Sequence, residues 1–322
     1  MSVLSQPRFH DEAKAFEYLE SLIWADGKVC PHCGVVNGRI YDLAGVRGKP
    51  SKKSPEGALR HGLKKCGECR KQFTVKVGTV FEDAKLPLHK MLQAVHLMMS
   101  SKKGISSHQL SRILEIQYNS AWFLSHRFRE AMRSGDLAPF GSGGTPVEVD
   151  ETYLGNRKGA ERRRGVAHKM TVLALVDRAS GTMRSFHIDQ ANTATVAPIV
   201  LANISREARL MTDEARIYWP IGKAFAEHSS THHSIGQYVD LKDRTIHTNT
   251  IEGAFSIFKR GMKGVYQHCG EQHLHRYLAE FEFRYNHRTA NGVDDRQRAD
   301  NALMGIVGKR LTYKTTDDST AA

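Results

Sequence analysis

Two C-x-x-C pairs near the N-terminus constrain the fold of this chain more than any other feature. Cys30-Pro-His-Cys33 and Cys66-Gly-Glu-Cys69 each present two thiols from one tight turn, with a glycine directly after Cys33 and Cys66. A structural zinc ion takes four such ligands in a tetrahedron, and knuckles of this spacing are typical of zinc ribbons. The sequence therefore predicts a structural Zn²⁺ bound by all four cysteines, with an inserted hairpin between the two pairs.

The remaining features of the front segment indicate an intracellular protein. The first twenty residues are polar and lack the apolar stretch of a signal peptide. No run of about eighteen apolar residues occurs, so we expect no membrane partner. In an intracellular protein, cysteines serve as thiols or metal ligands more often than as disulfides. The isolated Cys269 is expected to be a small core residue.

Positive charge is in excess over the whole chain. There are 47 Lys and Arg against 34 Asp and Glu, which gives a net charge of +13. Such a surplus favours a polyanionic partner, because each neutralised phosphate releases counterions. The excess is strongest over residues 44–76, around the second cysteine pair. We predict phosphate contacts from Lys64, Lys65 and Arg70, against the alternative of a basic protein without such a partner.

Hydrophobic periodicity divides the front half into short modules. It predicts an amphipathic helix over residues 9–24, a strand over 73–81 and an almost continuously helical segment over 86–136. Within that segment, Ser106 or Ser107 can cap one short helix, and a second helix can begin near Asn119. Two such helices joined by a turn are typical of a helix-turn-helix. Any pair of amphipathic helices gives a similar pattern, but we predict that Arg127 and Arg129 are available to DNA.

The pattern changes to strands after the flexible break Gly141–Gly144. The order β-β-β-α-β-α predicts an α/β domain with a central mixed sheet. Its predicted elements are strands at 147–150, 170–176, 183–188 and 209–213, and helices at 193–208, 251–262 and 273–285. The predicted domains are an N-terminal helix with zinc ribbon (1–84), a helical DNA-binding region (85–140), the α/β domain (141–310) and a disordered tail (311–322).

Three acids stand where phosphoryl-transfer chemistry needs them. Asp150 ends the alternating run Val-Glu-Val-Asp, Asp213 ends Leu-Met-Thr-Asp, and Glu252 lies on a helix with Lys259 two turns further along. Carboxylates from different elements must converge to hold two divalent ions, Mg²⁺ or Mn²⁺, beside a scissile phosphate. A nearby lysine can then bind the phosphates of the DNA backbone.

Each acid also has an ordinary interpretation. Asn249-x-x-Glu252 fits a capping box, in which the glutamate only closes the helix end. Asp213 fits a turn residue. On a strand, Glu148 and Asp150 share one face, and one of two such acids normally faces solvent.

Taken together, the motifs resemble the bacterial insertion-sequence transposases that join an N-terminal zinc ribbon to a DDE catalytic core of the RNase H-like fold. The resemblance is carried by C-P-H-C…C-G-E-C-R-K-Q-F, G-I-S-S-H-Q-L-S-R-I-L, V-E-V-D-E-T-Y-L-G, L-M-T-D-E-A and H-T-N-T-I-E-G-A-F-S-I-F-K-R-G, in this order over nearly the whole chain. It implies Asp150, Asp213 and Glu252 as the metal-binding triad with Lys259 as companion. Because some relatives have Asn at the third position, Asn249 is the alternative to Glu252.

The resemblance also implies the partners. They are double-stranded DNA, both the terminal inverted repeats and the target, and further copies of the chain in a synaptic complex in the nucleoid of a bacterial cytoplasm. Further DNA contacts are predicted from basic residues that follow the first aspartate or lie beside Lys259: Arg157, Lys158, Arg162, Arg163, Arg164, Lys169 and Arg260. A solvated hairpin tip is the alternative for the first six. The competing functions are an RNase H-like nuclease that never joins strands and a zinc-ribbon transcriptional regulator.

Overall fold

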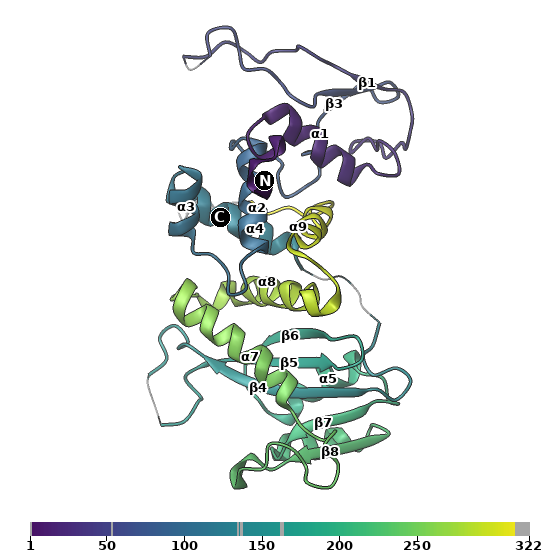
Figure 1. Ribbon diagram of the computed structural model, residues 1–322, viewed down its shortest axis with the longest axis vertical. Helices are drawn as coiled ribbons and strands as arrows, with labels where there is room; N and C mark the ends of the chain where they lie inside the picture. The colour runs from purple at the N-terminus through teal and green to yellow at the C-terminus, as the bar shows by residue number, and fades with distance from the viewer. Residues whose placement is uncertain (1, 53, 134, 136–137, 162–163, 313–322) are drawn as a thin grey trace, which may run out of the picture. The chain divides into compact units, whose positions relative to one another are not determined.

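The chain divides into two compact units (Figure 1). The ribbon unit comprises residues 1–101, 105–132 and 295–322, and the sheet unit comprises 102–104 and 133–294. The structure, a computed structural model, describes residues 2–52, 54–133, 135, 138–161 and 164–312. Arg162, Arg163 and most of the predicted tail therefore lie outside the described residues. The domain limits drawn from the sequence stay predictions.

The ribbon unit begins with a capped helix and a small sheet. Helix α1 (Glu12–Ile23) starts where the Asp11 carboxylate accepts the backbone N–H of Lys14 at 2.8 Å. Strands β1 (Ile40–Asp42), β2 (Lys64–Cys66) and β3 (Gln72–Phe73) form an antiparallel sheet. The strand predicted over 73–81 is wrong beyond its first residue. Val75, Val80 and Phe81 are buried from a series of turns, so their apolar character reflects core packing rather than strand pairing.

Three helices follow where one nearly continuous helical segment was predicted. They are α2 (Leu88–Met99), α3 (Ser107–Leu114) and α4 (Tyr118–Ala131). Ser106 caps α3 by accepting the N–H of Gln109 at 3.1 Å, and Glu115 ends it in the left-handed region at φ +51°. Helices α3 and α4 pack together, as two short helices joined by a turn. Their role as a DNA-binding helix-turn-helix stays a prediction.

The ribbon unit is completed by the C-terminal end of the chain. Helix α9 (Asp295–Met304) packs against α1 and α2, and Arg298 Nη1 donates to the Met99 carbonyl at 2.8 Å. Just after the helix, the Ile306 carbonyl accepts the N–H of Val80 at 3.2 Å. The sequence Asp-Arg-Gln-Arg-Ala-Asp-Asn is too polar to show a helical apolar stripe, so hydrophobic periodicity does not reveal α9.

The sheet unit is built on five strands in the order β6-β5-β4-β7-β8. The strands are β4 (Pro146–Leu154), β5 (Met170–Asp177), β6 (Thr182–Ile188), β7 (Arg209–Asp213) and β8 (Glu227–Thr231). The first three pair antiparallel, whereas β7 is parallel to β4 and β8 is parallel to β7. The predicted RNase H-like mixed sheet is confirmed, with one strand added. The β8 sequence Glu-His-Ser-Ser-Thr has no apolar alternation, which is why periodicity misses it.

Helices cover both faces of this sheet. Helix α5 (Thr193–Asn203) lies on one face together with the short α6 (Trp219–Gly222). Helices α7 (Asn249–Gly261) and α8 (Leu274–Asn286) lie on the other (Figure 1). Because side chains alternate along a strand, Val147 and Val149 of β4 belong to the α5 core. Glu148 and Asp150 therefore point to the α7 face.

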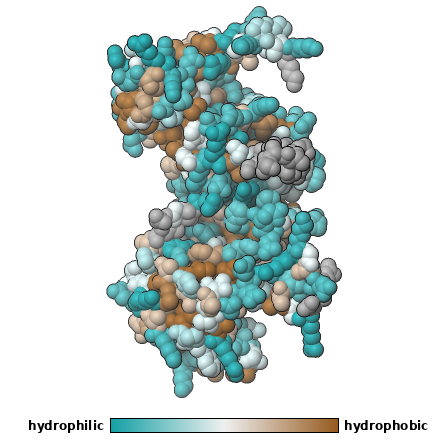
Figure 2. Space-filling view, turned by 180° about the vertical axis from the view of Figure 1, so that it is seen from behind, coloured by the Kyte–Doolittle hydropathy of each residue, from teal (hydrophilic) through white to brown (hydrophobic). Residues whose placement is uncertain are grey.

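Helix α5 is apolar around most of its circumference. Only Val196 and Val200 are fully buried, while Pro198 and Ala202 are exposed. Figure 2 shows hydrophobic side chains gathered on this face of the sheet unit. No helix among the described residues is long and apolar enough to cross a membrane.

Candidate zinc and active sites

The four cysteines of the two knuckles converge in the ribbon unit. The Sγ atoms of Cys30 and Cys69 are 3.7 Å apart, those of Cys33 and Cys66 are 3.8 Å apart, and all four lie within 4.8 Å of one another. Zn–S bonds of about 2.3 Å in a tetrahedron place thiolates about 3.8 Å apart, so the donor set fits zinc. The predicted site can therefore hold the ion, and Cys269, which donates to the Gly270 carbonyl at 3.4 Å, is not part of it.

The basic side chains around this site divide into buried and exposed ones. Lys65 and Arg70 are exposed and can reach a phosphate. Lys64 is only 4% exposed, and its Nζ lies 2.6 Å from Asp42 and 2.9 Å from Glu20. The prediction of a Lys64–DNA contact is therefore wrong, because the ammonium group forms ion pairs that link α1 to the ribbon sheet.

The two arginines predicted to read DNA from α4 are also buried. Arg127 is 8% exposed, donates to the Glu82 carbonyl at 2.9 Å and packs over the Phe123 ring. Arg129 is 1% exposed, and its Nη1 donates to Ser125 Oγ at 3.2 Å. Neither is available to DNA in this structure. Their carbonyl, hydroxyl and aromatic partners come from the fold, and nothing in the local sequence marks these side chains as buried.

The three predicted catalytic acids come from three elements of the sheet unit. Asp150 lies in the middle of β4, Asp213 is the last residue of β7, and Glu252 lies in the first turn of α7. Asp150 and Glu252 line one cleft with a volume of 620 Å³. Its remaining lining includes the cations Lys259, Arg260 and Lys263, whereas Asp213 is not among the lining residues.

Electrostatic coupling nevertheless includes all three acids. Burial raises the pKa of Asp150 to about 8, with further upward contributions from the charges of Glu151, Asp213 and Glu252. Burial also raises the pKa of Asp213 and of Glu151. Crowded, partly desolvated carboxylates of this kind repel one another and favour a bound cation. The donor chemistry therefore fits a hard divalent ion.

The acids do not close around a single ion in this structure. Among the described residues, the cysteines are the one group of three or more His, Cys, Asp or Glu side chains whose ligand atoms all lie within 4.8 Å. A two-metal site spans a wider region, because its ions are themselves about 4 Å apart.

Glu252 has a different environment from the one a capping box requires. The N-cap of α7 is Thr248, and it makes no side-chain capping bond. Instead Thr248 Oγ1 donates to Glu252 Oε1 at 3.2 Å, and His233 Nε2 lies 3.5 Å from the same oxygen. Asn249 is exposed and is not among the residues that line the cleft. Glu252 thus lines the cleft while its carboxylate accepts the hydroxyl of the N-cap residue Thr248.

Glu148 is a site residue that the sequence reasoning did not assign. Its side chain is 0% exposed, Arg178 Nε donates to Oε1 at 2.5 Å, and the backbone N–H of Ile251 donates to Oε2 at 2.8 Å. The expected solvent-facing acid is not Glu148, which is fully buried, and Asp150 is partly buried and lines the cleft. Their shared strand face was the available signal, since that face is covered by α7.

His233 was also not assigned. It follows β8 in a loop whose backbone is held by Glu214, which accepts the N–H of His233 at 2.7 Å and of Ser234 at 2.9 Å. Burial is the largest single influence on the pKa of Glu214 and raises it, but the combined hydrogen bonds, chiefly from the backbone of Ser234 and His233, lower the pKa to about 2. Glu214 directly follows Asp213, so the loop is fastened beside the second acid.

The basic segment between β4 and β5 is only partly described. Arg157 donates to the Lys169 carbonyl at 3.2 Å and lies 3.7 Å from Glu271, so it is held by the protein. Lys158 and Arg164 are exposed. Arg162 and Arg163 lie outside the described residues.

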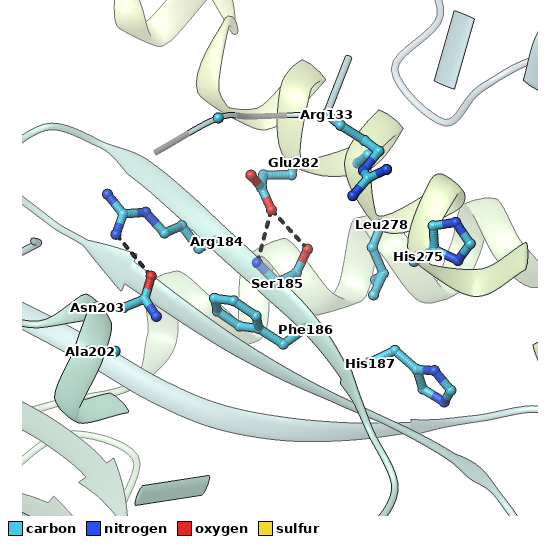
Figure 3. A pocket seen from close by; sticks show the side chains of 12 residues that line it. Arg133, Arg184, Ser185, Phe186, His187, Ala202, Asn203, His275, Leu278 and Glu282 are labelled. Atoms are coloured by element: carbon cyan, nitrogen blue, oxygen red, sulfur yellow. Dashed lines mark hydrogen bonds between the residues drawn. The ribbon is translucent and has the colours of Figure 1, made fainter. Parts of the chain in front are cut away.

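A second cavity of the sheet unit, of 780 Å³, lies away from the acids (Figure 3). There Glu282 of α8 accepts the Ser185 N–H at 2.9 Å and its hydroxyl at 3.1 Å, and Arg184 donates to Asn203 at 3.0 Å. Among the described residues β6 is an edge strand, and the bond from Glu282 satisfies the backbone N–H of Ser185 on it. None of the three acids lines this cavity.

The fold and the cysteine site define an RNase H-like protein with an N-terminal zinc ribbon. Residues 142–286 match the model of the ISXO2-like transposase domain, and residues 10–72 match that of the transposase zinc-ribbon domain. Together the two models cover more than half of the chain. The chain belongs to the insertion-sequence transposases that carry an N-terminal zinc ribbon.

Comparisons with individual proteins add little to this. No curated protein matches the chain. Among solved structures, it is similar to a chain in the cryo-EM structure of the simian T-cell lymphotropic virus intasome in complex with PP2A regulatory subunit B56 gamma, at 14% identity and a TM-score of 0.24. The match covers 47% of this chain and 54% of that one, so it spans about half the length of the viral chain. A TM-score this low supports no conclusion about the present protein.

Proposed function

We propose that this transposase binds the terminal inverted repeats of an insertion sequence and catalyses metal-dependent DNA cleavage and strand transfer. The observation that carries the proposal is the electrostatic coupling of Asp150 with Asp213 and Glu252 beside a cleft lined by Lys259. Asp150, Asp213 and Glu252 would hold two Mg²⁺ or Mn²⁺ ions. When bound, such ions stabilise the charge that develops on the attacking and leaving oxygens.

The residues of the chain contribute binding and orientation. Exposed Arg260 and partly buried Lys259 present cations on the α7 side of the cleft, where they can neutralise phosphates next to the scissile bond. Strand β4 carries Asp150 and helix α7 carries Glu252, so two elements supply the two acids that line the cleft. Hydrolysis of one phosphodiester leaves a 3′-hydroxyl, and attack of that hydroxyl on a target phosphodiester joins the strands with one P–O bond formed for each one broken.

DNA binding is proposed for exposed cations in both units. They are Lys65 and Arg70 of the zinc ribbon, and Lys158, Arg164 and Arg260 of the sheet unit. Joining two element ends to one target requires more than one active site, so we propose a homo-oligomer in a synaptic complex.

A strand-transfer assay with precut terminal repeats tests this function. Joined product with Mg²⁺ supports a transposase, nicks alone would indicate a nuclease, and binding without chemistry would indicate a regulator. Asp150→Asn and Asp213→Asn should abolish cleavage and joining, by at least about a thousandfold, while sparing DNA binding. Glu252→Gln should behave like them, and Asn249→Ala should retain activity. The opposite pattern would make Asn249 the third catalytic residue.

A further inference from the structure

The first turn of α7 is anchored by a charge from another element. The first N–H groups of a helix have no partner within the helix and carry a partial positive charge. In α7 the N–H of Ile251 is bound at 2.8 Å by the fully buried carboxylate of Glu148, which lies on β4. A buried carboxylate is stable only with such bonds and a countercharge, and Arg178 supplies the countercharge at 2.5 Å.

The same arginine extends the anchor to the segment before α7. Its Nη2 contacts His247 Nδ1 at 3.0 Å, and the guanidinium also donates to the carbonyls of Thr245 and His247. His247 Nδ1 in turn accepts the N–H of Asn249 at 3.3 Å. Strand β4, the end of β5 and the start of α7 therefore share one connected polar cluster, which we name the Glu148–Arg178 anchor.

The anchor joins the supports of two catalytic acids. Glu148 precedes Asp150 by two residues on the same face of β4, and Ile251 directly precedes Glu252 on α7. Because the strand and the helix turn are each stiff over so short a span, the bond between Glu148 and Ile251 constrains the distance between the two acids. A shift of the first turn of α7 by about 1 Å would misplace Glu252 relative to Asp150.

We propose that Glu148 is a positioning residue that fixes α7 to β4 and so sets the separation of Asp150 and Glu252 required for metal binding. This inference rests on the proposed function, in which those two acids hold divalent ions. It assigns Glu148 no contact with metal or DNA.

The test compares two buried glutamates in the full-length protein. Glu280 is also 0% exposed and paired with an arginine, Arg284, at 2.5 Å, but it lies on α8 and bonds Tyr266 rather than the start of α7. Glu148→Gln and Glu280→Gln should both lower the melting temperature. Only Glu148→Gln should weaken Mn²⁺ binding, by about 10- to 100-fold, as measured by electron paramagnetic resonance of free Mn²⁺ without DNA.

The outcomes separate the inference from the proposed function. Equal Mn²⁺ affinity in the two glutamine variants would overturn the positioning role while leaving the metal site intact. Absence of Mn²⁺ binding in the wild type, or binding unchanged by Asp150→Asn, would overturn the proposed function and the inference with it. If Glu148→Gln does not fold, Arg178→Lys provides the second variant, because it retains the charge and loses the forked bonds to the loop. Its Mn²⁺ affinity should fall by about tenfold, and an unchanged affinity would overturn the inference.

Discussion

His233 Nε2 lies 3.5 Å from Glu252 Oε1 and 3.0 Å from Thr231 Oγ1, so one imidazole connects the end of β8 to the third acid on α7. The backbone of the same residue is bound by Glu214, the neighbour of Asp213. His233 thus links the loop beside the second acid to the side chain of the third.

Replacing this imidazole should misorient Glu252. We expect His233→Ala to lower strand cleavage about tenfold or more, in the range typical for residues that orient metal ligands, and His233→Gln to retain more activity because an amide can still donate. The exposed neighbour His232 offers a matched control. The measurement is the cleavage rate at saturating Mg²⁺. Equal rates for His232→Ala and His233→Ala would show that the His233 imidazole does not orient Glu252.

The metal-free protein should lose stability as pH rises. Asp150 has an ordinary pKa of 3.8 in the unfolded chain and about 8 in the folded protein. Between these values the folded state holds a proton that the unfolded chain has released, so the free energy of unfolding falls with increasing pH, by up to the order of 5 kcal/mol.

Asp150→Asn should remove this part of the pH dependence. Urea unfolding in the presence of a chelator, at several pH values between about 4 and 8, gives the free energy of unfolding of each protein. The difference between wild type and variant is the contribution of Asp150. If the free energy of unfolding changed with pH equally in the two proteins, the raised pKa of Asp150 would be contradicted.

Zinc should hold the ribbon unit together. Cys66→Ser removes a buried thiolate from the four-sulfur site and should lower the zinc content from about one ion per chain to near zero, with unfolding of the ribbon. Cys269→Ser keeps all four ligands and should leave the zinc content unchanged. Elemental analysis and limited proteolysis of both variants give the readout.

Neighbouring lysines of the ribbon should affect different properties: Lys64 the stability of the fold, and Lys65 the binding of DNA. Lys64→Ala removes the buried cation that bridges Glu20 and Asp42, of which Asp42 retains Lys28 at 2.9 Å, and should cost on the order of 3 kcal/mol of stability. Lys65→Ala and Arg70→Ala should change stability by no more than about 0.5 kcal/mol. For DNA binding, each should make the negative slope of log K against log salt less steep by about 0.9. Thermal melts and binding titrations at several salt concentrations separate the two effects.

Two glycines of α7 give a packing test within one helix. A Cβ at Gly261 would lie 2.4 Å from Phe281 of α8 and 2.8 Å from the Lys103 carbonyl, so Gly261→Ala should destabilise by about 1–3 kcal/mol. A Cβ at Gly253 meets nothing within 4 Å, and Gly253→Ala should stabilise by about 0.5–1 kcal/mol through its helix propensity. Chemical denaturation measures the stability of both variants. Effects of the same sign would contradict the close packing of α7 against α8 at Gly261.

Features governed by local chemistry could be predicted from the sequence. The cysteine spacing predicts the zinc site, and apolar strands predict most of the mixed sheet together with the elements that carry Asp150, Asp213 and Glu252. By contrast, β8 and α9 are too polar to show a periodic apolar pattern. Lys64, Arg127 and Glu148 appear in the sequence as surface charges. They are buried because partners distant in the sequence, such as Glu20, Glu82 and Ile251, neutralise or bind them.

The late position of α9 in the chain affects how the protein matures during translation. The residues of the sheet unit are all synthesised before α9, whereas α1 and α2 lack the helix that packs against them until residues 295–304 emerge from the ribosome. The nascent chain should therefore complete its central unit first and its N-terminal helices afterwards, which reverses the usual vectorial order. A fragment that ends before residue 295 would leave an apolar surface of α2 open and should bind chaperones or aggregate.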